Sequence, residues 1–100
     1  LAGLGADFAS AFESRLPLMP FFVYVLFSET AGKFYIGQTQ DIDNRLKRHN
    51  NGLEKFTQPY LPWILKCVIE KSSRSEAVIL EKKLKNLNKE KLIKFMEKYI

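Results

Sequence analysis

The sequence predicts one α+β domain, in which a three-stranded antiparallel sheet is flanked by helices. Two runs rich in β-branched and aromatic residues, 21–27 and 33–37, are separated by a short turn segment. A third such run follows at 63–70, and segments with helical periodicity lie between and after the strands. The 100 residues, of which 46% are apolar, suffice for one hydrophobic core and leave no room for a second domain.

The first two runs, FFVYVLF and KFYIG, predict a β-hairpin closed by a four-residue loop. If Ser28 faces Lys33 across that loop, Tyr24 lies opposite Gly37, and Tyr35 falls on the same face of the sheet as Tyr24. A loop one residue longer or shorter would put the two tyrosines on opposite faces.

A helix is expected between the hairpin and the third strand. Thr39 is a candidate N-cap, acidic residues follow in the first turn, basic residues occupy the last, and Gly52 can end the helix. At 100° per residue, one face of this helix carries Ile42, Arg45, Leu46 and His49. Two polar side chains therefore border the stripe that contacts the core, where a charge is costly unless it is paired or used.

The third strand, WILKCVIE at 63–70, follows a loop punctuated by two prolines. Trp63 is expected to anchor the core, and Cys67, the single cysteine, to behave as a small buried hydrophobe. Ser73 and Glu76 form a capping box that opens the next helix. Its apolar stripe consists of Ala77, Leu80, Leu84 and Leu87. Glu81 lies about 70° from the middle of that stripe and leans inward. A last amphipathic segment, 91–100, is expected to close the core.

The chain carries 16 Lys plus Arg against 11 Asp plus Glu, a net charge of +5, which favours a polyanionic partner such as nucleic acid. We expect residues 1–18 to be a leader of unknown role and the domain to span 19–100, beginning at Met19. No membrane-spanning stretch and no signal peptide are apparent, so a cytoplasmic location is expected by default.

Four motifs occur in a fixed order: FVY at 22–24, YIG at 35–37, RLKRH at 45–49, and Glu81 within EAVILEKKLK. Together they resemble the GIY-YIG nuclease superfamily, and most of all its short stand-alone members, over residues 20–95. The resemblance implies a divalent-metal-dependent endonuclease that hydrolyses phosphodiester bonds. The expected substrate is DNA, including structured or damaged forms met in repair or recombination, with RNA as a second candidate.

The same resemblance implies a role for each matching residue. Tyr24 matches the tyrosine that ends the GIY element and helps to activate the attacking water, and Tyr35 matches the tyrosine that opens YIG. Arg45 matches an arginine that steadies charge on the phosphate, and His49 a partner in proton transfer or phosphate contact. Glu81 matches the single carboxylate ligand of one Mg²⁺ or Mn²⁺ ion, which is chemically adequate because Mg²⁺ keeps most of its shell as water.

Basic side chains near these motifs are candidates for phosphate contact. A lysine-rich face on the Glu81 helix predicts a non-specific electrostatic track. The expected nucleic-acid-binding residues are Lys82, Lys85, Lys89, Arg48 and Lys55. Thr57, two residues after Lys55, is a further candidate for substrate contact.

Three alternatives remain open on the sequence alone. Arg45 could form a buried structural ion pair with Glu81. The chain could be a catalytically weak or inactive nucleic-acid-binding module of the same fold, since Met96 stands near the place where many GIY-YIG members have an asparagine. It could also be a protein-interaction domain.

Overall fold

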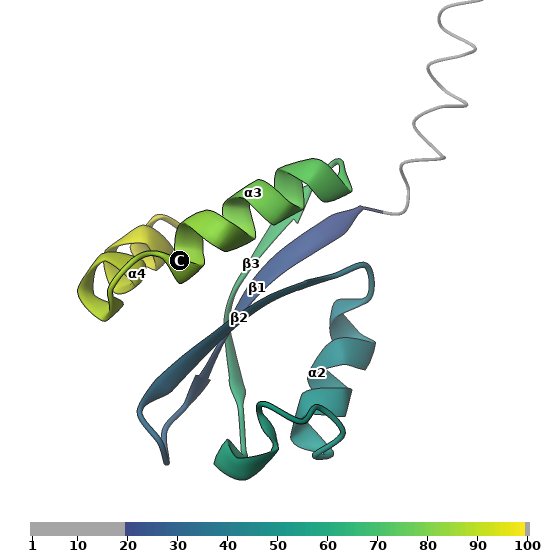
Figure 1. Ribbon diagram of the computed structural model, residues 1–100, viewed down its shortest axis with the longest axis vertical. Coiled ribbons are helices and arrows are strands. Elements are labelled where there is room, and N and C mark those ends of the chain that lie inside the picture. The colour runs from purple at the N-terminus through teal and green to yellow at the C-terminus, as the bar shows by residue number, and fades with distance from the viewer. Residues whose placement is uncertain (1–19, 100) are drawn as a thin grey trace, which may run out of the picture.

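The computed structural model describes residues 20–99, and the predicted leader 1–18 and Met19 lie outside the described residues. The strands are β1 (Phe21–Ser28), β2 (Lys33–Thr39) and β3 (Ile64–Lys71). The α-helices are α2 (Ile42–Asn50), α3 (Arg74–Lys85) and α4 (Lys89–Met96), and 3-10 helices span Gln58–Tyr60 and Glu97–Tyr99. The predicted α+β class, with one antiparallel sheet flanked by helices, is confirmed (Figure 1).

The sheet has the order β2-β1-β3, so β1 is central and pairs with an antiparallel neighbour on each side. Ser28 is paired with Lys33, and Tyr24 with Gly37, in the register predicted from a four-residue loop. Gly32 closes that loop at φ +65°, a backbone conformation that glycine adopts without strain. On the other side of β1, the pairing with β3 shifts by one residue after Val25.

Each face of the sheet has its own apolar cluster, because successive strand residues point to opposite faces. Helices α3 and α4 cover one face and α2 the other (Figure 1). The buried residues under α3 and α4 are Val23, Val25, Ile36, Cys67, Ile69, Ala77, Leu84, Leu92 and Met96. The buried residues on the α2 face are Tyr24, Leu26 and Trp63, and residues packed against them include Tyr35, Ile42 and Leu46. The expected core roles of Trp63 and Cys67 are thereby confirmed.

The cap of α2 differs from the sequence prediction. Asp41, and not Thr39, is the N-cap, and its carboxylate accepts a hydrogen bond from the Asn44 amide at 3.0 Å. Thr39 instead accepts from the Asp41 amide at 3.1 Å, which holds the chain in the turn before the helix. Both side chains can satisfy free amides there, and an aspartate gains more from the positive end of the helix.

The start of α3 agrees with the capping box in part. Ser73 is the N-cap and accepts from the Glu76 amide at 3.2 Å. The Glu76 carboxylate accepts from the amide and the hydroxyl of Ser72, one residue before the expected partner.

The third strand begins at Ile64 rather than Trp63. Within residues 20–99, no helix combines the length and the apolar character that crossing a membrane requires.

Candidate active site

Tyr24 lies at the centre of the sheet on the α2 face and is 1% exposed. Its ring packs directly on the backbone of Gly37, the cross-strand partner. A Cβ added to Gly37 would lie 2.7 Å from Cζ of that ring, closer than packed atoms approach one another. The glycine of the YIG element therefore leaves room for the tyrosine of the FVY element.

A chain of hydrogen bonds runs from Tyr24 through His49 to Thr57. The Tyr24 hydroxyl is 3.0 Å from His49 Nε2, and His49 Nδ1 is 2.8 Å from the Thr57 hydroxyl. Thr57 in turn donates to the carbonyl oxygen of Glu54 at 3.3 Å. Since the Thr57 proton is used there, Thr57 accepts from Nδ1–H, and Nε2 is left as the acceptor of the Tyr24 hydroxyl proton.

The loop after α2 holds this chain in place through Trp63. The Trp63 indole N–H donates to the Thr57 carbonyl oxygen at 2.8 Å. Asn50, at the end of α2, makes two hydrogen bonds with the Trp63 backbone, at 2.7 and 3.1 Å. His49 and Thr57 are each 1% exposed. The histidine therefore has a fixed ring orientation, because both ring nitrogens have partners in a rigid, buried setting.

Burial sets the charge state of both residues. It raises the pKa of the Tyr24 phenol well above its ordinary value of 10.0; Tyr35 adds to the rise and the positive charge of Arg45 opposes it. Burial also lowers the pKa of His49 from its ordinary 6.5. The negative charge of Glu54 acts in the opposite direction and is outweighed. Desolvation therefore outweighs the effect of Arg45, and the phenol pKa is raised although a cation lies nearby. At neutral pH, a neutral phenol faces a neutral imidazole.

Tyr35 stands beside this pair on the same face of the sheet, as its predicted register requires. Its ring centroid is 5.0 Å from that of His49 and 6.4 Å from that of Tyr24, in tilted or edge-on arrangements. Trp63 completes the aromatic group, with its ring centroid 6.2 Å from that of Tyr35. Tyr35 is half-buried, whereas Tyr24 and His49 are enclosed.

A polar depression of about 320 Å³ adjoins the start of α2. Its lining residues are Phe21, Gln38, Thr39, Gln40, Asp41, Asn44, Arg45 and Arg74. Among the described residues, two buried side-chain atoms lack a hydrogen-bond partner, and both belong to this lining: Arg45 Nε and Gln38 Oε1. A buried donor and a buried acceptor are thus without a protein partner at one place, where water, an ion or a ligand can bind.

Glu81 extends from α3 toward the end of β2, on the sheet face opposite Tyr24. One carboxylate oxygen accepts from Gln38 Nε2 at 2.8 Å, and the other lies 3.0 Å from Lys85 Nζ. Its side chain is 16% exposed, in agreement with the inward lean inferred from the sequence. No ion pair joins Arg45 to Glu81 in the described part of the chain, so the alternative of a structural bridge between them is wrong.

The chemistry of these donors fits one hard cation at Glu81. Within residues 20–99, no three His, Cys, Asp or Glu side chains gather into a ready-made cage. The Glu81 carboxylate has the Gln38 amide on one oxygen and the half-exposed Lys85 on the other. Mg²⁺ is commonly held by one or two protein oxygens and several waters, whereas Zn²⁺ needs a fuller set of protein ligands.

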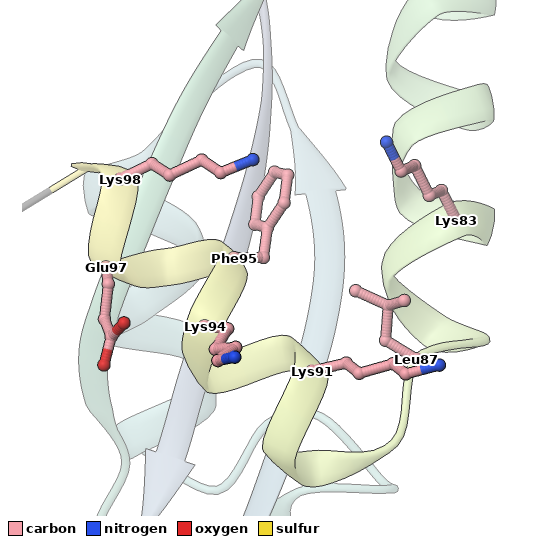
Figure 2. Close-up of a pocket in the computed structure, with 7 residues that line it drawn as sticks. All are labelled: Lys83, Leu87, Lys91, Lys94, Phe95, Glu97 and Lys98. Carbon is pink, nitrogen blue, oxygen red and sulfur yellow. The ribbon is translucent and has the colours of Figure 1, made fainter.

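The basic residues expected to contact phosphate lie at several separate places in the structure. Lys85 contacts Glu81, and Lys89 donates to the carbonyl oxygen of Gly32 at 3.2 Å. Lys82 and Lys55 are exposed, and Arg48 pairs with Glu54 at 2.7 Å. A separate depression of about 590 Å³ between α3 and α4 is lined by Lys83, Leu87, Lys91, Lys94, Phe95, Glu97 and Lys98. Figure 2 shows Lys83 and Lys98 reaching toward Phe95 from two helices, while Glu97 points away from the ring.

Sequence reasoning missed the part played by Gln38 and gave Thr57 no partner. Gln38 directly follows the YIG motif. No periodic pattern in the sequence indicates that its side-chain amide contacts a carboxylate 43 residues later. Thr57 was named, with Lys55, only as a candidate for substrate contact. Its hydrogen bond to a helical histidine depends on the fold of an irregular loop, which no sequence pattern encodes.

A protein-family comparison decides which family has this arrangement. The model of the GIY-YIG catalytic domain matches residues 20–94. The chain belongs to the GIY-YIG family. This GIY-YIG domain is 40% identical over 76 residues to a UPF0213 protein of Bacillus licheniformis, covering 72% of this chain and 77% of the relative. It is 34% identical over 68 residues to a UPF0213 protein of Bacillus cereus, covering 67% and 71% of the two chains.

A solved structure supports the same assignment. The solution NMR structure of a UPF0213 protein from Bacillus halodurans matches with a TM-score of 0.53 and 31% identity, covering 79% of this chain and 84% of the other. The chain covers 77% and 84% of the lengths of the Bacillus licheniformis and Bacillus halodurans proteins, in agreement with the resemblance to short members of the family. The GIY-YIG family is a nuclease family. Its substrates are nucleic acids, and its members generally use divalent metal ions.

Proposed function

We propose that this GIY-YIG domain is a divalent-metal-dependent endonuclease that hydrolyses phosphodiester bonds in DNA. The observation that carries the proposal is the unused donor of Arg45 in a polar depression whose lining also includes Gln38, the partner of Glu81. A guanidinium with free donor capacity is suited to a phosphate, whose oxygens it can contact in a planar fork. Tyr24 and His49 form a hydrogen-bonded pair that can accept a proton from a water molecule near the phosphate.

Tyr24 relays a proton in this proposal and does not act as a free phenolate. Its raised pKa makes the phenolate scarce, so the hydroxyl accepts a proton from the attacking water while giving its own to His49 Nε2. The water becomes the nucleophile, Tyr24 ends unchanged, and His49 becomes an imidazolium. Because Tyr24 is 1% exposed, the proposal requires that substrate binding admits one water molecule to its hydroxyl.

Arg45 and Glu81 act on the phosphate from the two sides of the sheet. In-line attack builds negative charge on the non-bridging and leaving oxygens, and the Arg45 guanidinium stabilises that charge without reorganising. Glu81 would hold one Mg²⁺ or Mn²⁺ ion, which supplies Lewis-acid stabilisation of the same oxygens when bound. The polar depression, reached by Arg45 from α2 and by Gln38 from the Glu81 side of the sheet, is where the phosphate would lie.

The substrate expected from the sequence is unchanged: DNA, with structured or damaged forms and RNA as further candidates. The lysine depression around Phe95 supports a polyanion, because four lysines line it and the ammonium groups of Lys83 and Lys98 lie over the aromatic ring. A role in repair or recombination and a cytoplasmic location stay predictions. A nucleic-acid-binding module without activity is the second candidate, favoured by the lysine next to Glu81, which occupies the carboxylate.

Glu81→Gln tests the proposal, since it keeps the size of the side chain and removes its charge. Nicking of supercoiled DNA and cleavage of branched DNA would be measured with Mg²⁺ or Mn²⁺, together with melting of the metal-free protein. We expect cleavage to collapse while the variant stays folded and still binds DNA. Glu76→Gln, in the exposed first turn of the same helix, is the matched control. A folded Glu81→Gln protein that cuts at the wild-type rate refutes the metal role of Glu81, and wild-type protein inert on every substrate favours the binding module.

A further inference from the structure

We propose that the side-chain amide oxygen of Gln38 is a second protein ligand of the divalent ion at Glu81, reached by a half turn of the amide group. This inference rests on the proposed function, because it presumes an ion at that carboxylate. Its basis is one contact and one missing contact. Gln38 Nε2 donates to Glu81 Oε1 at 2.8 Å, and Gln38 Oε1 is buried without any partner.

The half turn exchanges the two terminal atoms and changes little else in the shape of the side chain. Without a cation, the observed orientation is favoured, because the amide N–H faces a carboxylate oxygen. With a cation at Glu81, that N–H would point at a positive charge, and the oxygen is the atom that a hard cation attracts. One buried amide atom lacks a partner in either orientation, so this cost does not decide between them.

The spacing of the two atoms suits a shared ion. In an octahedral shell with ligands at about 2.0–2.1 Å, neighbouring oxygens lie about 2.9 Å apart. Gln38 Nε2 and Glu81 Oε1 are separated by 2.8 Å, so an oxygen placed at the Nε2 position would form one edge of such a shell. The pair therefore needs no movement of β2 relative to α3 to bind an ion together.

The position of Gln38 also links the ion to the phosphate site. Gln38 and Arg45 line the same polar depression, from opposite sides of the sheet. An ion on Gln38 and Glu81 would border the phosphate that Arg45 contacts. Lys85, which is 54% exposed, neutralises the carboxylate in the metal-free protein and would be displaced into solvent.

Manganese binding measured by NMR tests this directly. Mn²⁺ broadens the signals of nearby nuclei, so substoichiometric Mn²⁺ added to ¹⁵N-labelled protein should broaden the Gln38 side-chain amide before that of Gln58. Gln58 is exposed in the 3-10 helix at 58–60 and serves as the matched reference. We expect Gln38→Met to weaken Mn²⁺ binding roughly 10- to 100-fold, as removal of groups around a metal often does. Gln58→Met should leave it unchanged.

The outcomes separate this inference from the proposed function. Mn²⁺ that broadens signals around Glu81 and binds Gln38→Met as tightly as wild type overturns the role of Gln38 alone. Wild-type protein without a Mn²⁺ site near Glu81 overturns both the role of Gln38 and the metal dependence. Should Gln38→Met fail to fold, Gln38→Glu retains an oxygen at this position and is expected to bind Mn²⁺ at least as tightly as wild type, and weaker binding counts against the inference.

Discussion

The hydroxyl of Tyr24 lies so close to Gly37 that a Cβ on the glycine would be 2.5 Å from the hydroxyl oxygen. Among the described residues, positive φ angles occur at Gly32 and Gly52, and Gly37 is not one of them. Gly37 is therefore required by the side chain across the ladder and not by its own backbone conformation. The two motifs FVY and YIG are thus linked by a steric constraint as well as by pairing.

Gly37→Ala should displace the Tyr24 ring and break its hydrogen bond to His49. Overpacking of this kind costs about 1–3 kcal/mol of unfolding free energy, and cleavage should fall with it. A double-mutant cycle with Tyr24→Leu, followed by chemical denaturation, checks the cause. The cost of the alanine should shrink in the Tyr24→Leu background, and strictly additive effects would contradict the steric explanation.

Tyr24→Phe should retain the fold and DNA binding while lowering the cleavage rate by about 100-fold or more, because the variant lacks only the hydroxyl that relays the proton. Single-turnover cleavage with saturating enzyme measures the chemical step. Tyr99→Phe, at a 51% exposed tyrosine, is the control and should cut normally. Unchanged turnover in Tyr24→Phe would leave Tyr24 a packing residue.

Stability should decrease as the pH falls below the ordinary histidine pKa of 6.5. The pKa of His49 is lower in the folded than in the unfolded chain, so the unfolded state binds the extra proton first. The stabilisation is complete above 6.5 and is lost as the pH falls through the folded pKa. Because His49 is the single histidine in the sequence, its NMR titration is unambiguous. Denaturation of wild type and His49→Gln at pH 5–8 should show this slope in the wild type alone.

Arg45→Lys should lower kcat/KM for DNA cleavage although it keeps the positive charge. A lysine cannot reproduce the planar fork of the guanidinium. Losing one charge-assisted hydrogen bond costs about 1.5–3 kcal/mol, which corresponds to a roughly 10- to 100-fold lower rate. Arg48→Lys is the control, because a lysine keeps the positive charge that pairs with Glu54 and that a non-specific phosphate contact at this position would use. Equal activities of the two variants would argue against a geometric role for Arg45.

Lys85→Met should strengthen divalent-ion binding, because it removes an ammonium group 3.0 Å from the Glu81 carboxylate. A charge at this range contributes about 1 kcal/mol in a water-like dielectric, so we expect roughly fivefold tighter Mn²⁺ binding. Lys83→Met, on the same helix, is the control for general loss of positive charge. Calorimetric titration with Mn²⁺ measures both, and equal affinities would mean that Lys85 does not compete with the ion.

Much of the fold was predictable because local signals agreed with one another. The four-residue loop and the alternation of the hairpin strands set the register that brings Tyr24 and Tyr35 to one face. Helical spacing likewise predicted that Arg45 and His49 border the α2 face. These predictions use periods of two and 3.6 residues, which the sequence displays directly.

The remaining features depend on contacts that are distant in the sequence. The direction of the Tyr24 pKa shift follows from full burial, which motif spacing does not reveal. The gathering of Lys83 and Lys98 around Phe95 depends on the angle between α3 and α4. The pairing of Glu81 with Gln38, and not with Arg45, depends on which sheet face each helix covers.

Gly37 and Gln38 are consecutive in β2, yet one meets Tyr24 on the α2 face and the other meets Glu81 under α3. Because successive strand residues point to opposite faces, two consecutive residues serve the two sides of the site. A deletion of one residue before Gly37 would place the glutamine opposite Tyr24, whereas an insertion of one residue there would place the glycine beside Glu81. Related proteins are therefore expected to vary in length at the 29–32 turn. The number of residues between the positions of Tyr35 and Gln38 is expected to stay constant.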